Sequence, residues 1–268
     1  MSRNKGRIFI GIGGWSYDPW RESFFPSDLP RKRELEYASR KLTSIEINGT
    51  FYRTQTAATF AKWRDETPEG FVFSVKAPRF AMMRKKVAEA GESIARFFGS
   101  GVTELGDRLG PILWQFAPTR KFDAEFFEGF MGLLPKEAGG RALRHAIEVR
   151  HESFCAPQFV AAARAHGVAI VVAGDSKYPL IADVTAPFVY ARIMGTRADV
   201  AQGYDGAELD RWAAGAKEWA AGDAPPDLAC LAAEKQKSSP RDVYLYVISG
   251  AKERNPAAAM GLIERVAS

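Results

Sequence analysis

The chain has few of the residues that build disulfide frameworks or metal centres. Its 268 residues include only two cysteines, Cys155 and Cys230, and three histidines. Two cysteines are too few for the disulfide framework of a small secreted protein, so we expect reduced thiols and a cytoplasmic location. No apolar run approaches the roughly 18–20 residues of a membrane-spanning helix, so we expect no membrane partner. The basic and then apolar N-terminus has too short an apolar stretch for a signal peptide and predicts a first strand.

Neither positive nor negative charge is in large excess. The sequence has 37 Lys and Arg against 32 Asp and Glu, a net charge of +5, with 46% hydrophobic and 26% charged residues. This composition excludes wholesale disorder and is typical of a globular protein. The small positive excess is weak evidence for a nucleic-acid partner.

Eight short β-branched and apolar runs recur along the chain, each bounded by turn residues. They cover residues 7–12, 44–48, 71–76, 111–115, 145–150, 168–173, 188–194 and 243–248. Most are almost continuously hydrophobic, which is typical of strands covered on both faces in a parallel sheet.

Helical spacing of apolar residues predicts helices between these runs. They cover residues 31–42, 57–66, 92–109 in two parts, 123–134, 157–166 and 206–220, and a last helix opens at Asn255-Pro256. We expect Asn255 to be the N-cap of that helix and Gly167 to close another in the left-handed conformation. The repeated alternation predicts a TIM-type (β/α)8 barrel of parallel strands, one domain over residues 1–268.

Two connections are irregular. Strands six and seven are close in sequence and the link contains Pro179 and Pro187, so its helix should be short or missing. Residues 222–241 predict a surface insertion with a mobile loop. A dinucleotide-binding open sheet would need G-x-G-x-x-G leading into a helix, but Ser16 stands at the last glycine position and aromatic residues follow.

Polar side chains fall on one face of the predicted strands, near their C-terminal ends. They are Glu46, Asn48, Lys76, Gln115, Glu148, Arg150, Asp175 and Arg192. Since the outer face of a barrel meets apolar helices, these groups should face the lumen at the end where barrel active sites are built. Two interpretations stay open: a ligand site, or a satisfied ion network that pairs Glu46 with Lys76 and Glu148 with Arg192.

The predicted rim also carries Trp15, Tyr17, Tyr52 and Arg53, which would form a stacking wall for a flat group or simply pack the loops. His151 is the one histidine suited to catalysis. The set Glu46, Glu148, His151 and Asp175 has no recognised metal-ligand spacing, so we predict no metal and no cofactor.

Several long motifs in order resemble the YecE-like family, known as domain of unknown function 72. They occupy residues 11–20, 25–26, 46–53, 73–78, 109–116, 148–154 and 242–246. The resemblance spans nearly the whole chain and implies a TIM-type barrel with no established activity. Where the family tends to have Arg-Leu-His-Gly after strand seven, this chain has Met194 in place of the histidine. Where the family usually ends strand eight with Phe-Asn-Asn, this chain has Val-Ile248-Ser249.

Two function classes remain. The first is a metal-independent enzyme with hydrolase- or isomerase-type acid/base chemistry on a small anionic, sugar- or phosphate-like substrate. Glu46, Glu148 and His151 would then be catalytic, and Lys76, Arg150 and Arg192 would bind the anion. The alternative is a nucleic-acid-binding or processing protein that uses the rim aromatics and the basic triplets at residues 31–33 and 84–86.

Overall fold

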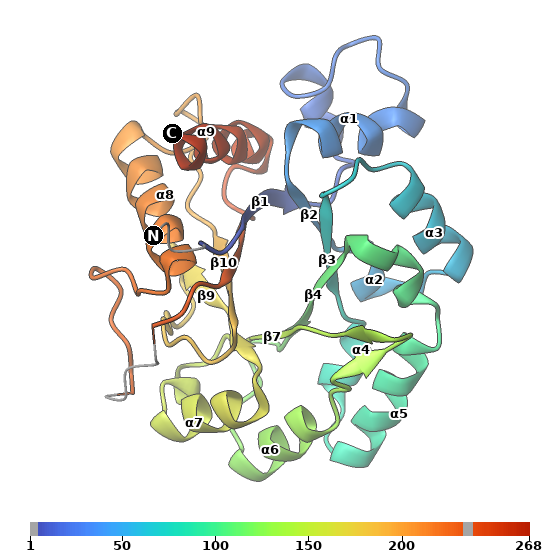
Figure 1. The fold of residues 1–268 in the computed structure, drawn as a ribbon, viewed down its shortest axis with the longest axis vertical. Helices are drawn as coiled ribbons and strands as arrows, with labels where there is room; N and C mark the ends of the chain where they lie inside the picture. Colours follow the sequence, from blue (N-terminus) through green and yellow to red (C-terminus); the bar gives the residue numbers. More distant parts are fainter. Residues whose placement is uncertain (1–4, 233–237) are drawn as a thin grey trace.

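The predicted strands form one parallel sheet that curves into a barrel. The computed structural model describes residues 5–232 and 238–268, and Figure 1 looks along the barrel, with strands around its centre and helices outside them. The strands of this sheet are β1 (Ile8–Gly13), β2 (Ser44–Ile47), β3 (Val72–Lys76), β4 (Leu109–Gln115), β7 (His145–Glu148), β8 (Ala169–Ile170), β9 (Val172–Gly174), β10 (Phe188–Ile193) and β11 (Asp242–Val247). All their pairings are parallel, so the predicted TIM-type architecture is confirmed.

The barrel closes at the sixth predicted strand, which is divided into two short pieces in the structure. Neighbouring strands run in the order β8-β7-β4-β3-β2-β1-β11-β10-β9. The two ends of this order, β8 and β9, are consecutive pieces of the strand predicted over residues 168–173. The first pairs with β7 and the second with β10. Between them, Val171 donates its N–H to the Ile147 carbonyl at 2.9 Å, so the two edges of the sheet meet at this strand.

Helices follow the strands as the alternation predicts. The α-helices are α1 (Glu34–Lys41), α2 (Gly49–Tyr52), α3 (Ala57–Asp65), α4 (Arg79–Met83), α5 (Val87–Phe98), α6 (Ala124–Gly132), α7 (Pro157–His166), α8 (Gly206–Ala221) and α9 (Asn255–Ala267). Short 3-10 helices are η1 (Asp18–Glu22), η2 (Arg31–Arg33), η3 (Val102–Arg108), η4 (Glu152–Phe154) and η5 (Lys252–Arg254). Residues 176–187 contain no helix, as the two prolines in that link predict. In the part of the chain that the structure describes, no helix combines the length and apolar character needed to span a membrane.

Two local details differ from the sequence expectations. Asn255 is the first residue of α9 rather than its N-cap, which is Arg254. The Asn255 side chain is buried and accepts a hydrogen bond from Thr196 Oγ1 at 2.8 Å, so a tertiary contact takes the oxygen that was expected to cap the helix. A short antiparallel hairpin, β5 (Glu137–Ala138) with β6 (Arg141–Ala142), was not predicted. Its turn uses Gly139 and Gly140 at φ of 58° and 71°, which glycine adopts without strain.

Side-chain alternation divides the apolar residues into two regions. Ile10, Ile12, Ile45 and Ile47 point outward and pack in the large core between strands and helices. The barrel lumen holds a smaller apolar cluster, which includes Phe9, Leu113, Phe188, Tyr244 and Ile248. The lumen is therefore packed with side chains over much of its length, and its polar groups lie toward the C-terminal ends of the strands.

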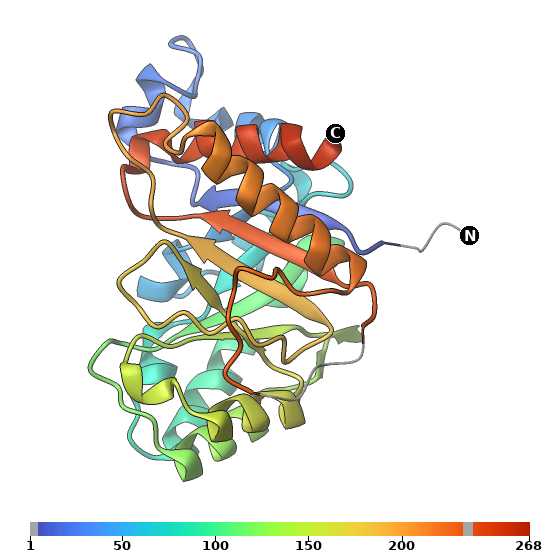
Figure 2. The same cartoon turned by 90° about the vertical axis from the view of Figure 1, so that its left-hand side faces the viewer.

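The described parts of the predicted insertion lie along the side of the barrel between α8 and α7, near the N-terminal ends of β10 and β11 (Figure 2). Asp183, buried ahead of β10, accepts the backbone N–H groups of Leu231 and Ala232 at 2.7 and 2.9 Å. Arg241, just before β11, donates to the Gly222 carbonyl at 2.9 Å. The Asp183 bonds therefore hold the middle of the segment to the link before β10, and the Arg241 bond joins the two ends of the segment to each other. Residues 233–237, on which part of the predicted mobile loop falls, lie outside the described residues.

Candidate active site at the C-terminal end of the barrel

Five of the predicted lumen residues come together at the C-terminal ends of the strands. Glu46 lies on β2, Lys76 ends β3, Glu148 ends β7, Arg192 lies on β10, and Arg150 follows β7. We call these five residues the lumen charge cluster. Both glutamates are fully buried, and Arg192 is 2% exposed. Charged groups this deeply buried must be paired or bind a ligand.

Arg192 joins the two glutamates. Its Nε lies 3.1 Å from Glu46 Oε2 and its Nη2 lies 3.0 Å from Glu46 Oε1, while its Nη1 donates to Glu148 Oε2. Burial works against the charged form of Arg192, but the Glu148 and Glu46 carboxylates outweigh it and raise the pKa. The sequence interpretation that paired Glu46 with Lys76 is wrong. The planar fork of Arg192 binds both carboxylates at once, which a lysine ammonium does less well.

Glu148 has donors on both of its oxygens. Besides Arg192 on Oε2, Gln115 Nε2 and Arg150 Nε donate to Oε1 at 2.9 and 2.6 Å. Burial alone would raise the pKa of Glu148, but Arg192 and Arg150 outweigh it and lower that pKa. Glu148 is therefore ionised at neutral pH and serves as the anchor of two arginines.

A layer of buried tyrosine and serine hydroxyls supports the cluster from within the lumen. The Tyr190 hydroxyl donates to Glu46 Oε2 at 2.7 Å and lies 2.7 Å from Ser74 Oγ. Burial raises the pKa of Tyr190 well above its ordinary value, so the hydroxyl stays protonated as a donor. The sequence prediction of the site did not include Tyr190. Its position two residues before Arg192 on the same strand face was the available signal.

Lys76 has no carboxylate partner in the part of the chain that the structure describes. Its side chain is 7% exposed, and among the described residues its ammonium makes no ion pair or hydrogen bond. Its Nζ lies over the Phe51 ring, 4.3 Å from the ring centroid. Burial and the nearby Arg192 lower the pKa of Lys76 to about 8, more than the Glu46 and Glu148 charges raise it.

Two aromatic residues that the sequence prediction left out hold the cations in place. Phe51, on α2, lies under the Lys76 ammonium, and Thr50 Oγ1 donates to the Lys76 carbonyl at 2.7 Å, which fixes α2 to the end of β3. Tyr178, from the link after β9, stacks on Arg150 with 4.2 Å between the guanidinium carbon and the ring centroid. Neither residue follows a periodic pattern, so only the folded loops reveal these contacts.

Asp175 does not join the lumen charge cluster. It follows β9 as expected, but its carboxylate accepts hydrogen bonds from Arg211 Nη2 at 2.9 Å and from Trp212 Nε1 at 2.7 Å, both on α8. Its backbone has a φ of 50°, an unusual value for a non-glycine residue, which turns the side chain toward that helix. The sequence prediction that Asp175 faces the lumen with the other charges is therefore wrong, because its side chain faces α8.

The predicted rim aromatics have different surroundings. Trp15 packs edge-on against Trp63 with 5.2 Å between ring centroids, and Tyr17 packs on Trp20 at 5.4 Å. Tyr52 is 66% exposed. The structure thus shows loop packing for the first two and an open aromatic surface at Tyr52, rather than one continuous wall.

Three further predicted residues lie around the rim, and within the described part of the chain none of them bonds to a charged side-chain group of the cluster. His151 Nδ1 accepts the Ser153 N–H at 3.1 Å and caps η4. The Asn48 amide is 3.4 Å from the Glu46 carbonyl and lies beside Gly13. Arg53 is exposed just after α2.

Residues 5–232 and 238–268 contain no group of three or more His, Cys, Asp or Glu side chains placed to hold a metal ion. The two lumen glutamates are already occupied by arginine, which leaves them without free oxygens for a cation. A cation at this place would also face Arg150, Arg192 and Lys76.

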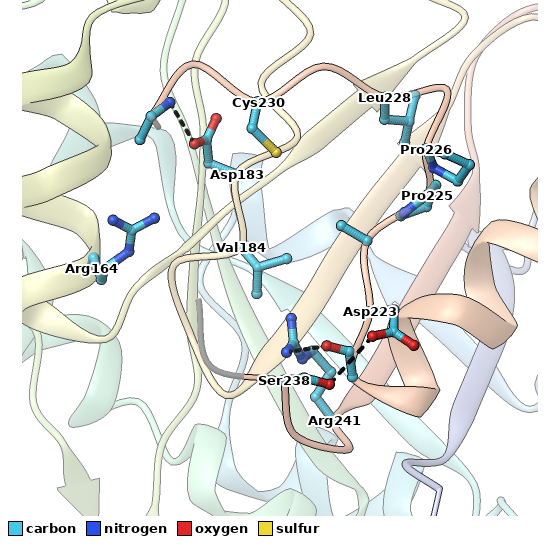
Figure 3. Close-up of a pocket in the computed structure, with 13 residues that line it drawn as sticks. Arg164, Asp183, Val184, Asp223, Pro225, Pro226, Leu228, Cys230, Ser238 and Arg241 are labelled. Atoms are coloured by element: carbon cyan, nitrogen blue, oxygen red, sulfur yellow. Dashed lines mark hydrogen bonds between the residues drawn. The ribbon is translucent and has the colours of Figure 1, made fainter. Parts of the chain in front are cut away.

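A separate cavity of about 580 Å³ lies at the opposite, N-terminal end of the barrel (Figure 3). It opens between α7, the link before β10 and the 222–241 segment. Asp183, Arg241 and Asp223 border it, yet the first two bind backbone groups and Asp223 accepts a 3.3 Å hydrogen bond from Ser238. These three polar side chains therefore hold chain segments together.

Comparison with known proteins places this architecture in a family. Residues 9–268 match the model described as "Protein of unknown function DUF72". The UPF0759 protein YunF of Bacillus subtilis is 28% identical over 116 residues, which cover 41% of this chain and 40% of that protein. The UPF0759 protein YecE of Escherichia coli K12 is 26% identical over 152 residues, which cover 56% of this chain and 50% of that protein. The chain thus spans about half the length of the curated relatives it matches.

Solved structures show the same fold. A DUF72 family protein from Thermotoga maritima superposes with a TM-score of 0.75 at 20% identity, covering 98% of this chain and all of that one. A xylose isomerase-like TIM barrel/4-hydroxyphenylpyruvate dioxygenase fusion protein superposes with a TM-score of 0.55 at 14% identity, covering 98% of this chain and 43% of that one. At these identities the likeness establishes the barrel alone.

Proposed function

This chain belongs to the DUF72 family, and we propose that its barrel is a metal-independent enzyme with hydrolase- or isomerase-type acid/base chemistry on a small anionic, sugar- or phosphate-like substrate. The observation that carries this proposal is the charge balance of the lumen charge cluster. Three cations, Lys76, Arg150 and Arg192, face two glutamates, and Arg192 already pairs with both carboxylates. A buried surplus of positive charge favours an anion at the mouth.

Arg150 and Lys76 are the groups best placed to receive that anion. The Nε of Arg150 binds Glu148 and its Nη1 binds the Tyr178 hydroxyl, which leaves Nη2 directed to no described partner. Arg192 uses all three of its nitrogens on the two glutamates, so its proposed role changes from anion contact to structural centre. In this proposal the residues that surround the substrate further out are Trp15, Tyr17, Asn48, Tyr52, Arg53 and Gln115, and Asp175 is no longer among them because it bonds to α8.

Proton transfer is the second part of the proposal. The sequence assigned it to Glu46, Glu148 and His151. Because both glutamates hold arginines, we assign them as positioning residues that act through Arg192 and Arg150. Lys76, with a pKa of about 8, exchanges a proton close to neutral pH and joins His151 as a proton-transfer group.

Calorimetric titration with inorganic phosphate at fixed salt tests the anion site. Lys76→Met and Arg150→Gln should each weaken binding by about 1–3 kcal/mol, while Lys62→Ala, which removes an exposed lysine of α3, should leave it unchanged. Binding by the unaltered protein should also fall as pH rises through 8, because Lys76 then loses its charge. Equal binding in all three variants would contradict the proposal.

A cytoplasmic location is part of the proposal. Its support is that Cys155 and Cys230 are both free thiols in the structure, as a reducing compartment requires.

A second candidate, nucleic-acid binding, is favoured by one observation on the rim. Tyr52 and Phe80 are 66% and 51% exposed on α2 and α4. Exposed basic residues accompany them: Arg53, Arg79, Arg84, Lys85 and Lys86. Exposed rings beside cations are what unpaired bases and phosphates bind. The other basic triplet, residues 31–33, is partly neutralised, since Arg31 pairs with Asp18 and Arg33 with Glu36.

Fluorescence anisotropy with a labelled oligothymidine at several salt concentrations separates the two candidates. A nucleic-acid site predicts steep weakening with salt and a loss of binding in Tyr52→Ala and Phe80→Ala. A small-anion site predicts saturable phosphate binding that persists at high salt and is unaffected by either rim substitution.

A further inference from the structure

The positive and negative charges of the lumen charge cluster balance without Lys76. Without it, Glu46 and Glu148 are matched by Arg192 and Arg150, and each of those four groups has a described partner. Lys76 adds a third cation in a buried place, and no carboxylate or carbonyl among the described residues accepts a hydrogen bond from it. A structural lysine in such a position has a desolvation cost and no compensating bond.

The charged groups that face Lys76 come from three strands and one loop. Glu46 on β2 and Glu148 on β7 favour its ammonium form, and Arg192 on β10 and Arg150 after β7 oppose it. The net result, together with burial, is a pKa of about 8, so on the order of a tenth of the side chain is free amine at neutral pH. An exposed lysine with an ordinary pKa has a far smaller free-amine fraction at that pH.

The neutral amine of a lysine beside other cations is a nucleophile toward carbonyl carbon. Resting on the proposed anion site, we propose that Lys76 forms a Schiff base with its substrate, and that this substrate is a small carbonyl compound bearing an anionic group which Arg150 binds. The inference stands on the place of Lys76: buried at the end of β3, without a counter-ion of its own, and next to an arginine with an unused nitrogen.

The chemistry balances within the site. The amine nitrogen bonds to the carbonyl carbon and the carbonyl oxygen takes a proton, which gives a carbinolamine. Loss of water then gives the iminium, so an ammonium and a carbonyl become an iminium and one water molecule. The iminium keeps the positive charge of Lys76, so the contact with the Phe51 ring and the balance with the two glutamates persist.

Reductive trapping tests the proposal on the full chain. The protein is incubated at pH 7 with glyoxylate and sodium cyanoborohydride, and the modified lysines are located by peptide mass mapping. We expect modification of Lys76 to exceed that of any other lysine at least tenfold. It should vanish from this peptide in Lys76→Arg, which keeps the cation, and persist in the control Lys62→Arg.

The role of Arg150 is tested with two probes. Arg150→Gln should raise the glyoxylate concentration needed for half-maximal labelling about tenfold. It should change labelling by the uncharged aldehyde propanal much less, because Arg150 is a minor cause of the lowered pKa of Lys76. An equal effect on both probes would overturn the assignment of Arg150 as the anion contact.

Labelling spread evenly over the lysines would overturn the Schiff-base proposal. Phosphate calorimetry separates that failure from a failure of the proposed function. Phosphate binding without selective labelling would leave an anion site in which Lys76 acts by charge alone. Selective labelling without phosphate binding would support the reactive lysine and remove the anion site.

Discussion

The two ends of the barrel each bury an arginine, and the two side chains are used differently. Arg192 at the C-terminal end is 2% exposed and pairs with the carboxylates of Glu46 and Glu148. Arg241 at the N-terminal end is 5% exposed and donates to the backbone carbonyls of Gly222 and Ser239. The pKa of Arg192 is raised, because the facing carboxylates outweigh burial, whereas burial lowers the pKa of Arg241.

This difference separates an end that is held together by bonds to the main chain from the end at which we propose the ligand site. At the N-terminal end, Asp183 and Arg241 are satisfied by main chain, and each bond fixes one segment against another. At the C-terminal end, charged side chains pair with one another and Lys76 remains as a surplus. Polar groups that finish their bonds within the fold hold it together, and those that do not are available to a ligand.

Replacement of the two arginines by leucine gives the largest expected effect. Arg192→Leu leaves the buried Glu46 carboxylate without an ion-pair partner and removes one of the two arginines that bind Glu148, so it should cost about 3–5 kcal/mol in the free energy of unfolding. Arg241→Leu removes hydrogen bonds to carbonyl groups and should cost about 1–3 kcal/mol. Urea unfolding followed by circular dichroism measures both. Equal losses would show that the two ends do not differ as described.

The pH dependence of stability tests the surplus charge on Lys76. Because the folded state lowers this pKa from 10.5 to about 8, the folded state binds fewer protons than the unfolded state between those two values. The buried charge on Lys76 therefore lowers the free energy of unfolding below pH 8, and this destabilisation fades as the pH rises to 10.5. The stability of the unaltered protein relative to Lys76→Met should rise by about 3 kcal/mol across that range. A pH-independent difference between them would mean that Lys76 is not desolvated.

Asp183→Asn gives a smaller expected effect, confined to the N-terminal end. The amide keeps one acceptor oxygen for the N–H groups of Leu231 and Ala232 but loses the charge, so we expect a loss of about 1–2 kcal/mol in the free energy of unfolding. Limited proteolysis should cut the 222–241 segment faster, and phosphate affinity should stay unchanged. A change in phosphate affinity would show that the two ends are coupled.

The smallest expected effect belongs to the exposed rim. Tyr52→Ala should change the free energy of unfolding by less than about 0.5 kcal/mol, since most of that side chain is in solvent. A thermal melt measures the stability of this variant, and the oligothymidine titration measures its nucleic-acid binding. A large loss of stability would place Tyr52 in the fold rather than on an open surface.

The sequence alone determined the barrel and the strand face of each charge. Continuous apolar runs separated by helical periods require a parallel sheet covered on both faces, and strict alternation along a strand places Glu46, Lys76, Glu148 and Arg192 inward. These are local properties of the chain, so they are visible without the fold. The departures from the family motifs, Met194 and Ile248, were equally visible, and the buried Ile248 now lies in the lumen cluster.

Only the tertiary structure decided which charge meets which. Glu46 and Arg192 are 146 residues apart in the chain, and whether Glu46 pairs with Lys76 or Arg192 depends on the curvature of the closed barrel and the reach of a guanidinium. Asp175 faces α8 because its backbone φ of 50° directs the side chain that way. Tyr178 stacks on Arg150 from a link whose sequence has no helical or strand periodicity. The energy of each ion pair depends on the distance between the two charges across the lumen, and only the closed barrel sets that distance.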